Sequence, residues 1–489
     1  MSFDDKAAAF INEAKRIAKV VSSAERIYVF THIDADGISS GSIAYETARR
    51  LGIPVEIKFL KKLDDEATRL IRGKTDGLVW MNDLGSGYIS RFAGMNMVIA
   101  DHHEPEPENP IAVENGRAVL AESTINHLNA HLFGIEGSTE ICSSTTSYFI
   151  SRAVSRDNID LSPIGIVGAV GDLQDSRFGR LTGMNRIVLE DAAGSGFLEV
   201  VRDARFYGKE TRGLTKLLEY SVDPPIPGIA NEPGSPERLL QALRIEYRRN
   251  GKEQTWYDLD MDAKRSIMSY IVERMISERV PPEEINQVVG ETYLISANGG
   301  GMKGMPKDAK EFATLLNACG RYEHYETGMG ICLGDREHSL TEALKLLEGH
   351  RRNVANAIKL VKEEGMVQLK RVQYFHVKDR VPDSIVGTIA GILMKSKDVD
   401  GKKVIVGFAY SDGKVKVSGR GNTLLVSTGL NLSEAIRRAA ESVGGIGGGH
   451  SIAAGATIDV GRETDFAAAL DIAIDSQLVG AGEQKTSAS

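Results

Sequence analysis

Cysteine is scarce in this sequence. The chain of 489 residues contains only Cys142, Cys319 and Cys332, and none pairs with another at Cys-x-x-Cys spacing. This argues against a disulfide framework and a zinc finger, and favours a reducing compartment in which the cysteines are packing residues. Long apolar runs are also missing, since no segment approaches the roughly 20 apolar residues that span a bilayer. We therefore predict a cytoplasmic protein with no membrane association.

Positive charge is not in excess either. The 59 lysines and arginines are outnumbered by 67 aspartates and glutamates, for a net charge of −8. Because non-specific affinity for nucleic acid comes largely from cations that neutralise phosphates, this balance argues against a protein that simply coats nucleic acid. No basic stripe rich in aromatic residues provides a stacking platform for bases. Any nucleic-acid contact must be local, and a carboxylate metal site would explain part of the acidity.

The first half of the chain alternates apolar strands with helices. An amphipathic helix is predicted at 10–21, a buried strand at 26–31, a helix at 39–50, and apolar segments at 55–60, 78–81 and 97–100. Each apolar segment leads into a polar turn, as in β-α units of a parallel sheet. In such sheets the functional residues gather at the carboxyl ends of the strands.

The remainder suggests two further regions. Prolines and glycines cluster at 221–235, where we place a domain boundary, and a mostly helical region follows to about residue 320, with a glycine-rich loop at 299–304. Strands are predicted at 372–377, 403–409 and 414–418, with helices at 384–395 and 433–442. The predicted domains are therefore 1–220, 236–345 and 365–478.

Acidic and imidazole side chains follow several of the predicted strands. The clusters are His32-Ile-Asp34-Ala-Asp36-Gly37, Asn82-Asp83-Leu84-Gly85, Asp101-His102-His103 and, after the apolar stretch 164–170, Asp172. Each has an ordinary alternative: Asp34 or Asp36 alone fits a helix N-cap, an aspartate before glycine fits a turn, and adjacent histidines can decorate a loop. Together they predict a site for hard divalent cations, which take carboxylate oxygens and accept imidazole nitrogen.

Read in order, these segments resemble a known family. HIDADG, NDLG, DHHEPE and GAVGDLQD are similar to the four motifs of the DHH phosphoesterase superfamily, and GGIGGGH at 444–450 resembles the signature of the DHHA1 domain. RFYGKETR at 205–212, EFATLLNACGR at 311–321 and VSGR at 417–420 resemble archaeal RecJ-like proteins, including the GINS-associated nucleases. His32 stands where bacterial RecJ typically has aspartate. The resemblance covers most of the chain.

The resemblance implies an α/β fold: a DHH domain with a parallel β-sheet flanked by helices, a helical insertion, and a smaller α/β DHHA1-like C-terminal domain. It also implies two divalent cations, Mn²⁺ first, with Mg²⁺ or Co²⁺ as alternatives. His32 and Asp34 would hold one cation and Asp36, His102 and Asp172 the other, with Asp83 bridging both. Asp101 would accept a ring N–H from the ligating histidine, and His103 would face the scissile phosphate.

Substrate contacts are implied in the same way. The candidate residues are Asn317, Arg321, Ser418, Arg420, Gly447, Gly448, Gly449 and His450. The glycines would let backbone N–H groups approach phosphate oxygens, although a glycine cluster alone also fits a flexible loop. Arg205 and Arg212 are weaker candidates, because a lone basic residue is usually solvated or part of an ion pair.

The implied activity is two-metal-ion hydrolysis by a single-strand-specific exonuclease on DNA, RNA or both, in DNA replication or repair. Two alternatives stay open. The first is a phosphoesterase for small substrates such as nano-RNA, adenosine bisphosphate or a cyclic dinucleotide. The second is a replisome scaffold that binds GINS and the replicative helicase, with incidental nuclease activity. The expected partners are single-stranded nucleic acid and, through the family, GINS and the helicase.

Overall fold

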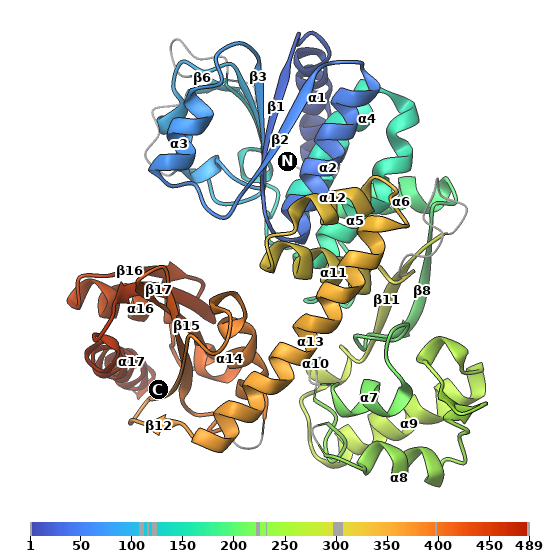
Figure 1. Ribbon diagram of the computed structural model, residues 1–489, viewed down its shortest axis with the longest axis vertical. Helices are drawn as coiled ribbons and strands as arrows, with labels where there is room; N and C mark the ends of the chain where they lie inside the picture. The colour runs from blue at the N-terminus through green and yellow to red at the C-terminus, as the bar shows by residue number, and fades with distance from the viewer. Residues whose placement is uncertain are drawn as a thin grey trace. The chain divides into compact units, whose positions relative to one another are not determined.

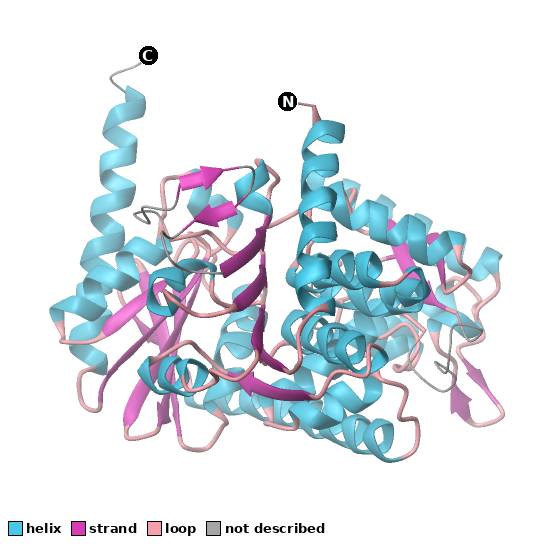
Figure 2. Ribbon diagram, turned by 90° about the horizontal axis from the view of Figure 1, so that it is seen from above, coloured by secondary structure: helices cyan, strands magenta, loops and turns pink. Residues whose placement is uncertain are grey.

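The chain folds as two compact units, Met1–Leu347 and Glu348–Ser489. The structure, a computed structural model shown in Figures 1 and 2, describes residues 2–106, 112–114, 117–119, 125–221, 225–230, 232–296, 307–396 and 399–486. The predicted glycine-rich loop at 299–304 lies outside the described residues. No helix among the described residues is long and apolar enough to cross a membrane.

A five-stranded parallel sheet forms the centre of the first unit, and the parallel sheet and four of its strands were predicted, while the fifth, at 125–129, was not. Its strands lie in the order β2-β1-β3-β4-β7. Their bounds are β1 Ile27–His32, β2 Val55–Leu60, β3 Leu78–Asn82, β4 Met97–Asp101 and β7 Ile125–Asn129. Every residue of β3, β4 and β7 is buried, because helices and turns cover both faces.

Neighbouring residues of one strand point to opposite faces of this sheet. Trp80 belongs to the larger hydrophobic core and Met81 to a smaller one on the other face. Helices shown in cyan in Figure 2 supply the rest of the packing. They are α1 Phe3–Ser22, α2 Ala35–Arg50, α3 Asp65–Arg72, α4 Ser143–Val154, α5 Ser162–Gly171 and α6 Gly183–Gly194. The predicted helix at 39–50 begins four residues late, since Asp34 is the N-cap and α2 begins at Ala35, within the motif that was interpreted as a turn of metal ligands.

A two-stranded ribbon leads out of this core. Strand β8, Leu198–Ala204, pairs antiparallel with β11, Val289–Ile295. The chain between them forms the middle module, residues 205–288, green in Figure 1, whose core surrounds Trp256. The proline-rich segment lies inside the module, with Ile226 buried. The module contains α7 Leu214–Glu219, α8 Ser235–Ala242, β9 Arg248–Arg249, β10 Lys252–Glu253, α9 Met261–Ser277 and α10 Pro282–Ile285.

Two helices after the ribbon return to the core of the first unit. Phe312 and Leu316 of α11, Ala309–Arg321, are fully buried there, and α12, Tyr325–Cys332, adds Ile331. The domain boundaries drawn from the sequence stay predictions. The packing shows that residues 309–332 share a core with the parallel sheet, while the middle module has a core of its own.

The second unit is a smaller α/β fold built on a mixed sheet of order β12-β13-β14-β15-β17-β16. Only β13 and β14 pair in parallel. The strands are β12 Val367–Gln368, β13 Val372–Lys378, β14 Val404–Ser411, β15 Lys414–Arg420, β16 Ile446–Gly449 and β17 Ala453–Asp459. Helix α13, His338–Glu364, begins in the first unit and continues into the second, whose other helices are α14 Val386–Met394, α15 Thr423–Ser427, α16 Leu432–Ser442 and α17 Glu463–Thr486.

Candidate metal centre

The first cluster forms where β1 passes into α2. His32 ends the strand, and Asp34 caps the helix by accepting a hydrogen bond of 2.9 Å from the Gly37 N–H. The other carboxylate oxygen of Asp34 lies 3.0 Å from Nδ1 of His32. The N-cap interpretation and the ligand interpretation of Asp34 are therefore compatible. Gly37 is needed here, because a Cβ would lie 2.4 Å from the carbonyl oxygen of His32.

Asp36 is buried in the first turn of α2 and points at the N-terminus of α4. Its Oδ2 accepts from the Ser143 N–H at 2.8 Å and its Oδ1 from the Ser144 N–H at 2.9 Å. The positive end of a helix dipole thus faces this carboxylate. Gly168 of α5 makes room, since a Cβ there would lie 2.6 Å from Asp36 Oδ1.

Asp83 follows β3 and stands at the centre of the cluster. It is 2% exposed, and its backbone has φ of 59°, a conformation that aspartate and asparagine tolerate better than most residues. Its Oδ2 lies 3.2 Å from His32 Nδ1, and its Oδ1 lies 3.6 Å from His102 Nε2. The hydroxyl of Ser143 donates to Oδ1 at 3.0 Å. The carboxylate thus has one oxygen on each side of the cluster.

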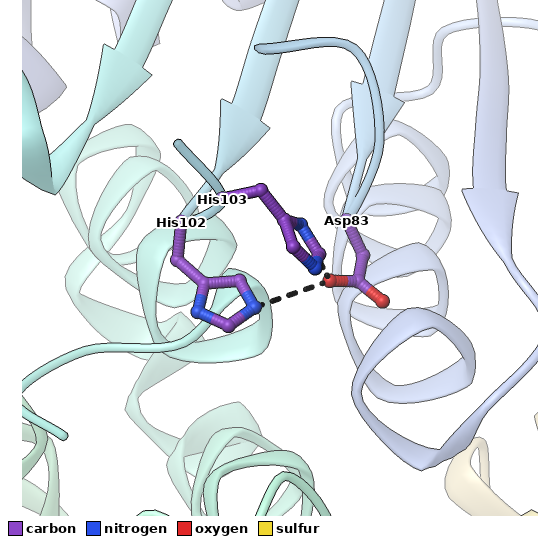
Figure 3. Close-up of side chains that lie close together, drawn as sticks. All are labelled: Asp83, His102 and His103. Carbon is purple, nitrogen blue, oxygen red and sulfur yellow. Dashed lines mark ion pairs between the residues drawn. The ribbon is translucent and has the colours of Figure 1, made fainter. Parts of the chain in front are cut away.

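His102 and His103 follow β4 and turn their rings toward Asp83 (Figure 3). Nδ1 of His102 lies 2.7 Å from the carbonyl oxygen of Gly137, which fixes the proton on Nδ1 and leaves the lone pair of Nε2 toward the cluster. Nε2 lies 4.0 Å from Asp36 Oδ2 and 3.7 Å from Asp172 Oδ2.

Asp101 was expected to accept a ring N–H from His102, and this prediction is wrong, because the donor is His103. Asp101 Oδ1 accepts from Nδ1 of His103 at 2.8 Å, while His102 uses a backbone carbonyl instead. The N–H groups of His102 and Ser86 also donate to Asp101. The half-exposed ring of His103 is therefore oriented by a buried carboxylate.

Asp172 reaches the centre from a helix end, since it is the C-cap of α5. The side chain of Gln174, fully buried, holds it in place. Nε2 of Gln174 donates to Asp172 Oδ2 at 3.1 Å and to the carbonyl oxygens of Gly137 and Ile141, each at 2.9 Å. Asn185 in turn donates to Gln174 Oε1 at 2.6 Å, which fixes the orientation of the amide.

Several carboxylates lie close together in the buried cluster, and their mutual repulsion and burial both disfavour the charged forms. Burial and the charge of Asp83 raise the pKa of Asp36 to about 7, and burial raises the pKa of Asp172 to about 6. Burial lowers the pKa of His102, but the hydrogen bond to Asp83 and the nearby carboxylates outweigh it and hold the pKa well above its usual range. Cations placed between these groups would relieve the repulsion.

The donor set fits divalent cations. Among the described residues, His32, Asp34 and Asp83 form one group, and Asp83, His102 and His103 form another, with ligand atoms within 4.8 Å of one another. Carboxylate oxygens with imidazole nitrogens and no thiolate suit Mn²⁺ or Mg²⁺ better than a structural zinc. The structure therefore brings all six sequence-predicted ligands to one place, and their roles stay predictions.

Helix α11 supports the first cluster. Oδ1 of Asn317 accepts from the Ala35 N–H at 3.0 Å, so this predicted substrate residue holds the start of α2. A Cβ on Gly320 would lie 1.8 Å from the carbonyl oxygen of Ile33. Arg321 ends the helix, and burial lowers its pKa while the charge of Asp34 opposes the effect. Substrate contact by Asn317 and Arg321 stays a prediction.

The remaining predicted substrate residues all belong to the second unit. Ser418 and Arg420 lie on β15, close to Gly387, where a Cβ would lie 2.6 Å from Arg420 Nη2 and 3.5 Å from Ser418 Oγ. Gly447, Gly448 and Gly449 form most of β16, the outer strand of the sheet, and His450 follows them, exposed. Their contact with substrate stays a prediction.

Several residues of the site were missed by sequence reasoning. Ser143, Ser144, Gly137 and Gln174 all contact the predicted ligands. The run Cys142-Ser-Ser-Thr-Thr-Ser147 was a usable signal, because hydroxyl residues gather at helix N-termini and such ends bind anions. Gln174 lies inside GAVGDLQD, and nothing in the local sequence indicated that its side chain contacts a ligand.

Comparison with known proteins decides the family. A family model described as DHH-CID domain matches residues 206–289, and one described as DHHA1 domain matches residues 369–476. An uncharacterized protein of Methanocaldococcus jannaschii is 30% identical over 465 residues, 94% of this chain and 96% of that protein. The chain belongs to the RecJ-like DHH/DHHA1 family. The predicted α/β class is confirmed.

Solved structures share the fold of this RecJ-like protein. CDC45 from Entamoeba histolytica superposes with a TM-score of 0.64 at 9% identity, covering 97% of this chain and 99% of that one. RecJ from Thermus thermophilus in complex with Mn²⁺ has a TM-score of 0.57 at 14% identity, covering 96% of this chain. The RecJ-like chain spans 55% of that Thermus protein. At these identities the likeness concerns the fold alone.

Manganese should stabilise this RecJ-like protein against heat. A ligand present at 100 times its Kd adds about 2.7 kcal/mol, which raises the unfolding midpoint by about 4 °C in a unit as large as Met1–Leu347. We expect this rise with Mn²⁺, its loss with EDTA, and its absence in Asp83→Asn, measured by differential scanning calorimetry. An unchanged midpoint for the wild type in saturating Mn²⁺ would count against a metal centre.

Proposed function

We propose that this chain is a metal-dependent phosphodiesterase that acts as a single-strand-specific exonuclease on DNA, RNA or both by two-metal-ion hydrolysis. One observation carries the proposal: the two oxygens of the buried Asp83 carboxylate face different groups of nitrogen and oxygen ligands. A carboxylate in this position is suited to bridge two cations. Two bound cations can activate a water and stabilise both the attacking and the leaving oxygen of an in-line displacement.

The residues of the chain have distinct tasks in this proposal. His32 and Asp34 would hold the cation on the Oδ2 side of Asp83, and Asp36, His102 and Asp172 would hold the one on the Oδ1 side. In the neutral ring of His102 the Gly137 carbonyl holds the proton on Nδ1, so that Nε2 is the nitrogen that a cation would take, and the N-terminus of α4 keeps Asp36 in its orientation. His103, whose Nδ1 donates to Asp101, presents Nε2 to the scissile phosphate. Mn²⁺ suits this donor set best, with Mg²⁺ or Co²⁺ as alternatives.

The second unit supplies phosphate contacts in the proposal. Backbone N–H groups of the glycine strand β16 can approach phosphate oxygens closely, because no side chain intervenes. Arg420 and His450 add charge-assisted hydrogen bonds to a terminal nucleotide. Contacts of this kind are local, which is consistent with a net charge of −8. They would favour attack from a strand end.

A scaffold function is the second candidate. The fold likeness to CDC45 extends over 97% of this chain, which fits a replisome role with GINS and the replicative helicase as partners. The complete set of acidic and histidine ligands argues against a purely structural role, since a lineage that lost catalysis would lose buried carboxylates first. Hydrolysis of small substrates is less favoured, because the middle module adds surface that such substrates do not need.

A substrate panel tests these candidates. End-labelled single-stranded DNA and RNA, duplex DNA, dinucleotides and adenosine bisphosphate would be incubated with the protein and Mn²⁺, with EDTA as the blank. We expect stepwise shortening of long single strands from the end that the label identifies, and little cleavage of duplex. Activity confined to dinucleotides or bisphosphates would overturn the exonuclease proposal. If no substrate were cleaved with Mn²⁺, Mg²⁺ or Co²⁺, the scaffold function would be the favoured candidate.

A further inference from the structure

A buried ion pair ties the turn after Asp172 to the start of the middle module. Nη2 of Arg205, the first residue after β8, lies 2.6 Å from Oδ2 and 3.2 Å from the carbonyl oxygen of Asp175. Both side chains are buried, with 7% and 5% exposed. Arg205 thus resembles neither a solvated cation nor a phosphate contact. It is the ion-pair partner of a residue three positions from a predicted ligand.

The ribbon holds the same turn at two further points. The N–H of Glu291 on β11 donates to the Gly179 carbonyl at 2.8 Å, and the N–H of Leu181 donates to the hydroxyl of Tyr293 at 2.7 Å. Gly290 makes the approach possible, because a Cβ there would lie 2.4 Å from the Gly179 carbonyl oxygen. Residues 172–181 are therefore seated on the strands that carry the middle module.

Hydrogen bonds continue from the turn into the metal centre. Gln174, next to Asp175, donates to Asp172 and to the Gly137 carbonyl, and that carbonyl also receives Nδ1 of His102. We infer that Arg205 is a positioning residue: through Asp175 it fixes the turn that places Asp172 and Gln174, and so the cation site on the Oδ1 side of Asp83. This inference rests on the proposed metal-dependent function.

Loss of the arginine has a specific physical consequence. Asp175 would be left as a buried, unpaired carboxylate, which is strongly unfavourable. The turn should rearrange so that this carboxylate becomes exposed to solvent. Asp172 and Gln174 would move with it. His32 ends β1 and Asp34 caps α2, where contacts with Gly37 and Asn317 hold the start of the helix independently of Asp175, so these two ligands should keep their places. The effect should fall on one of the two cation sites.

Mn²⁺ binding measured by electron paramagnetic resonance of the free ion tests the inference. We expect two tight sites in the wild type and, in Arg205→Gln, at least a tenfold loss of affinity at one of them. Lys209→Met is the matched control, because Lys209 is also a buried cation at this end of the ribbon, where Nζ donates to the Ala204 carbonyl at 2.8 Å and to Thr292 at 2.9 Å. It should lose stability and keep both sites.

Neutralising Asp175 as well should restore the Mn²⁺ affinity that Arg205→Gln removes. In Arg205→Gln/Asp175→Asn the uncompensated charge is gone, and we expect most of the Mn²⁺ affinity to return. If Arg205→Gln does not fold, Arg205→Lys gives the same comparison. Equal binding by the wild type and Arg205→Gln, or an equal loss in Lys209→Met, would overturn the inference alone. No Mn²⁺ binding by the wild type would overturn the proposed function with it.

Discussion

Asp83→Asn should reduce Mn²⁺-dependent hydrolysis of a single strand by at least about 1,000-fold, equivalent to about 4 kcal/mol of transition-state stabilisation. The amide cannot offer an anionic oxygen to both sides of the centre. The fold should persist, because asparagine tolerates the φ of 59° at this position and can still accept the bond from Ser143. Initial rates at saturating Mn²⁺, with circular dichroism of each variant, measure the effect.

Asp64→Asn is the matched control for Asp83. Asp64 caps α3 by accepting from the Ala67 N–H at 3.0 Å, and asparagine caps helices equally well. It should leave both the rate and the unfolding midpoint as they are. A rate for Asp83→Asn within tenfold of the wild type would show that Asp83 is no bridging ligand.

Gly320→Ala should lower the free energy of unfolding by about 3 kcal/mol, at the upper end of what overpacking costs. The added methyl group would lie 1.8 Å from the carbonyl oxygen of Ile33, so α11 has to move away from the first cluster. We expect activity to fall as well, because Asn317 on the same helix would release the Ala35 N–H. Urea unfolding at equilibrium, followed by circular dichroism, gives the stability.

Gly349→Ala should change the free energy of unfolding in the opposite direction. Gly349 lies within α13, where a Cβ would meet nothing within 4 Å. Alanine is a better helix former than glycine, so this change should raise stability by up to about 1 kcal/mol. If the two alanine variants were equally stable, α11 would not be packed against residues 32–36 in the way described.

Much of the parallel sheet could be predicted from the sequence because its inner strands are buried on both faces. Short apolar runs ending in polar turns identify β1, β3 and β4 directly. Strands β16 and β17 of the second unit consist largely of glycine and alanine, which carry no alternating pattern, and they were not predicted. β17 pairs with the edge of β15, and β16 then pairs with β17, which are tertiary contacts that no local pattern records.

The ligands could be predicted for a related reason. Acidic and histidine residues directly after strands reach the same edge of a parallel sheet, whatever their separation in sequence. No comparable sequence rule predicts the residues that hydrogen-bond to the ligands. Ser143 and Ser144 lie more than 100 residues after Asp36, and only the packing of α4 against α2 brings them together. That His103 and not His102 donates to Asp101 depends on which ring faces the Gly137 carbonyl.

Diffraction from a crystal grown with Mn²⁺, recorded at the manganese absorption edge, would show whether Asp83 bridges two cations. We expect anomalous density on both sides of the Asp83 carboxylate, one peak beside His32 and Asp34 and the other beside Asp36, His102 and Asp172. Both peaks should be lost or greatly weakened in Asp83→Asn. Anomalous density elsewhere in the molecule, or none in this cluster at saturating Mn²⁺, would contradict it.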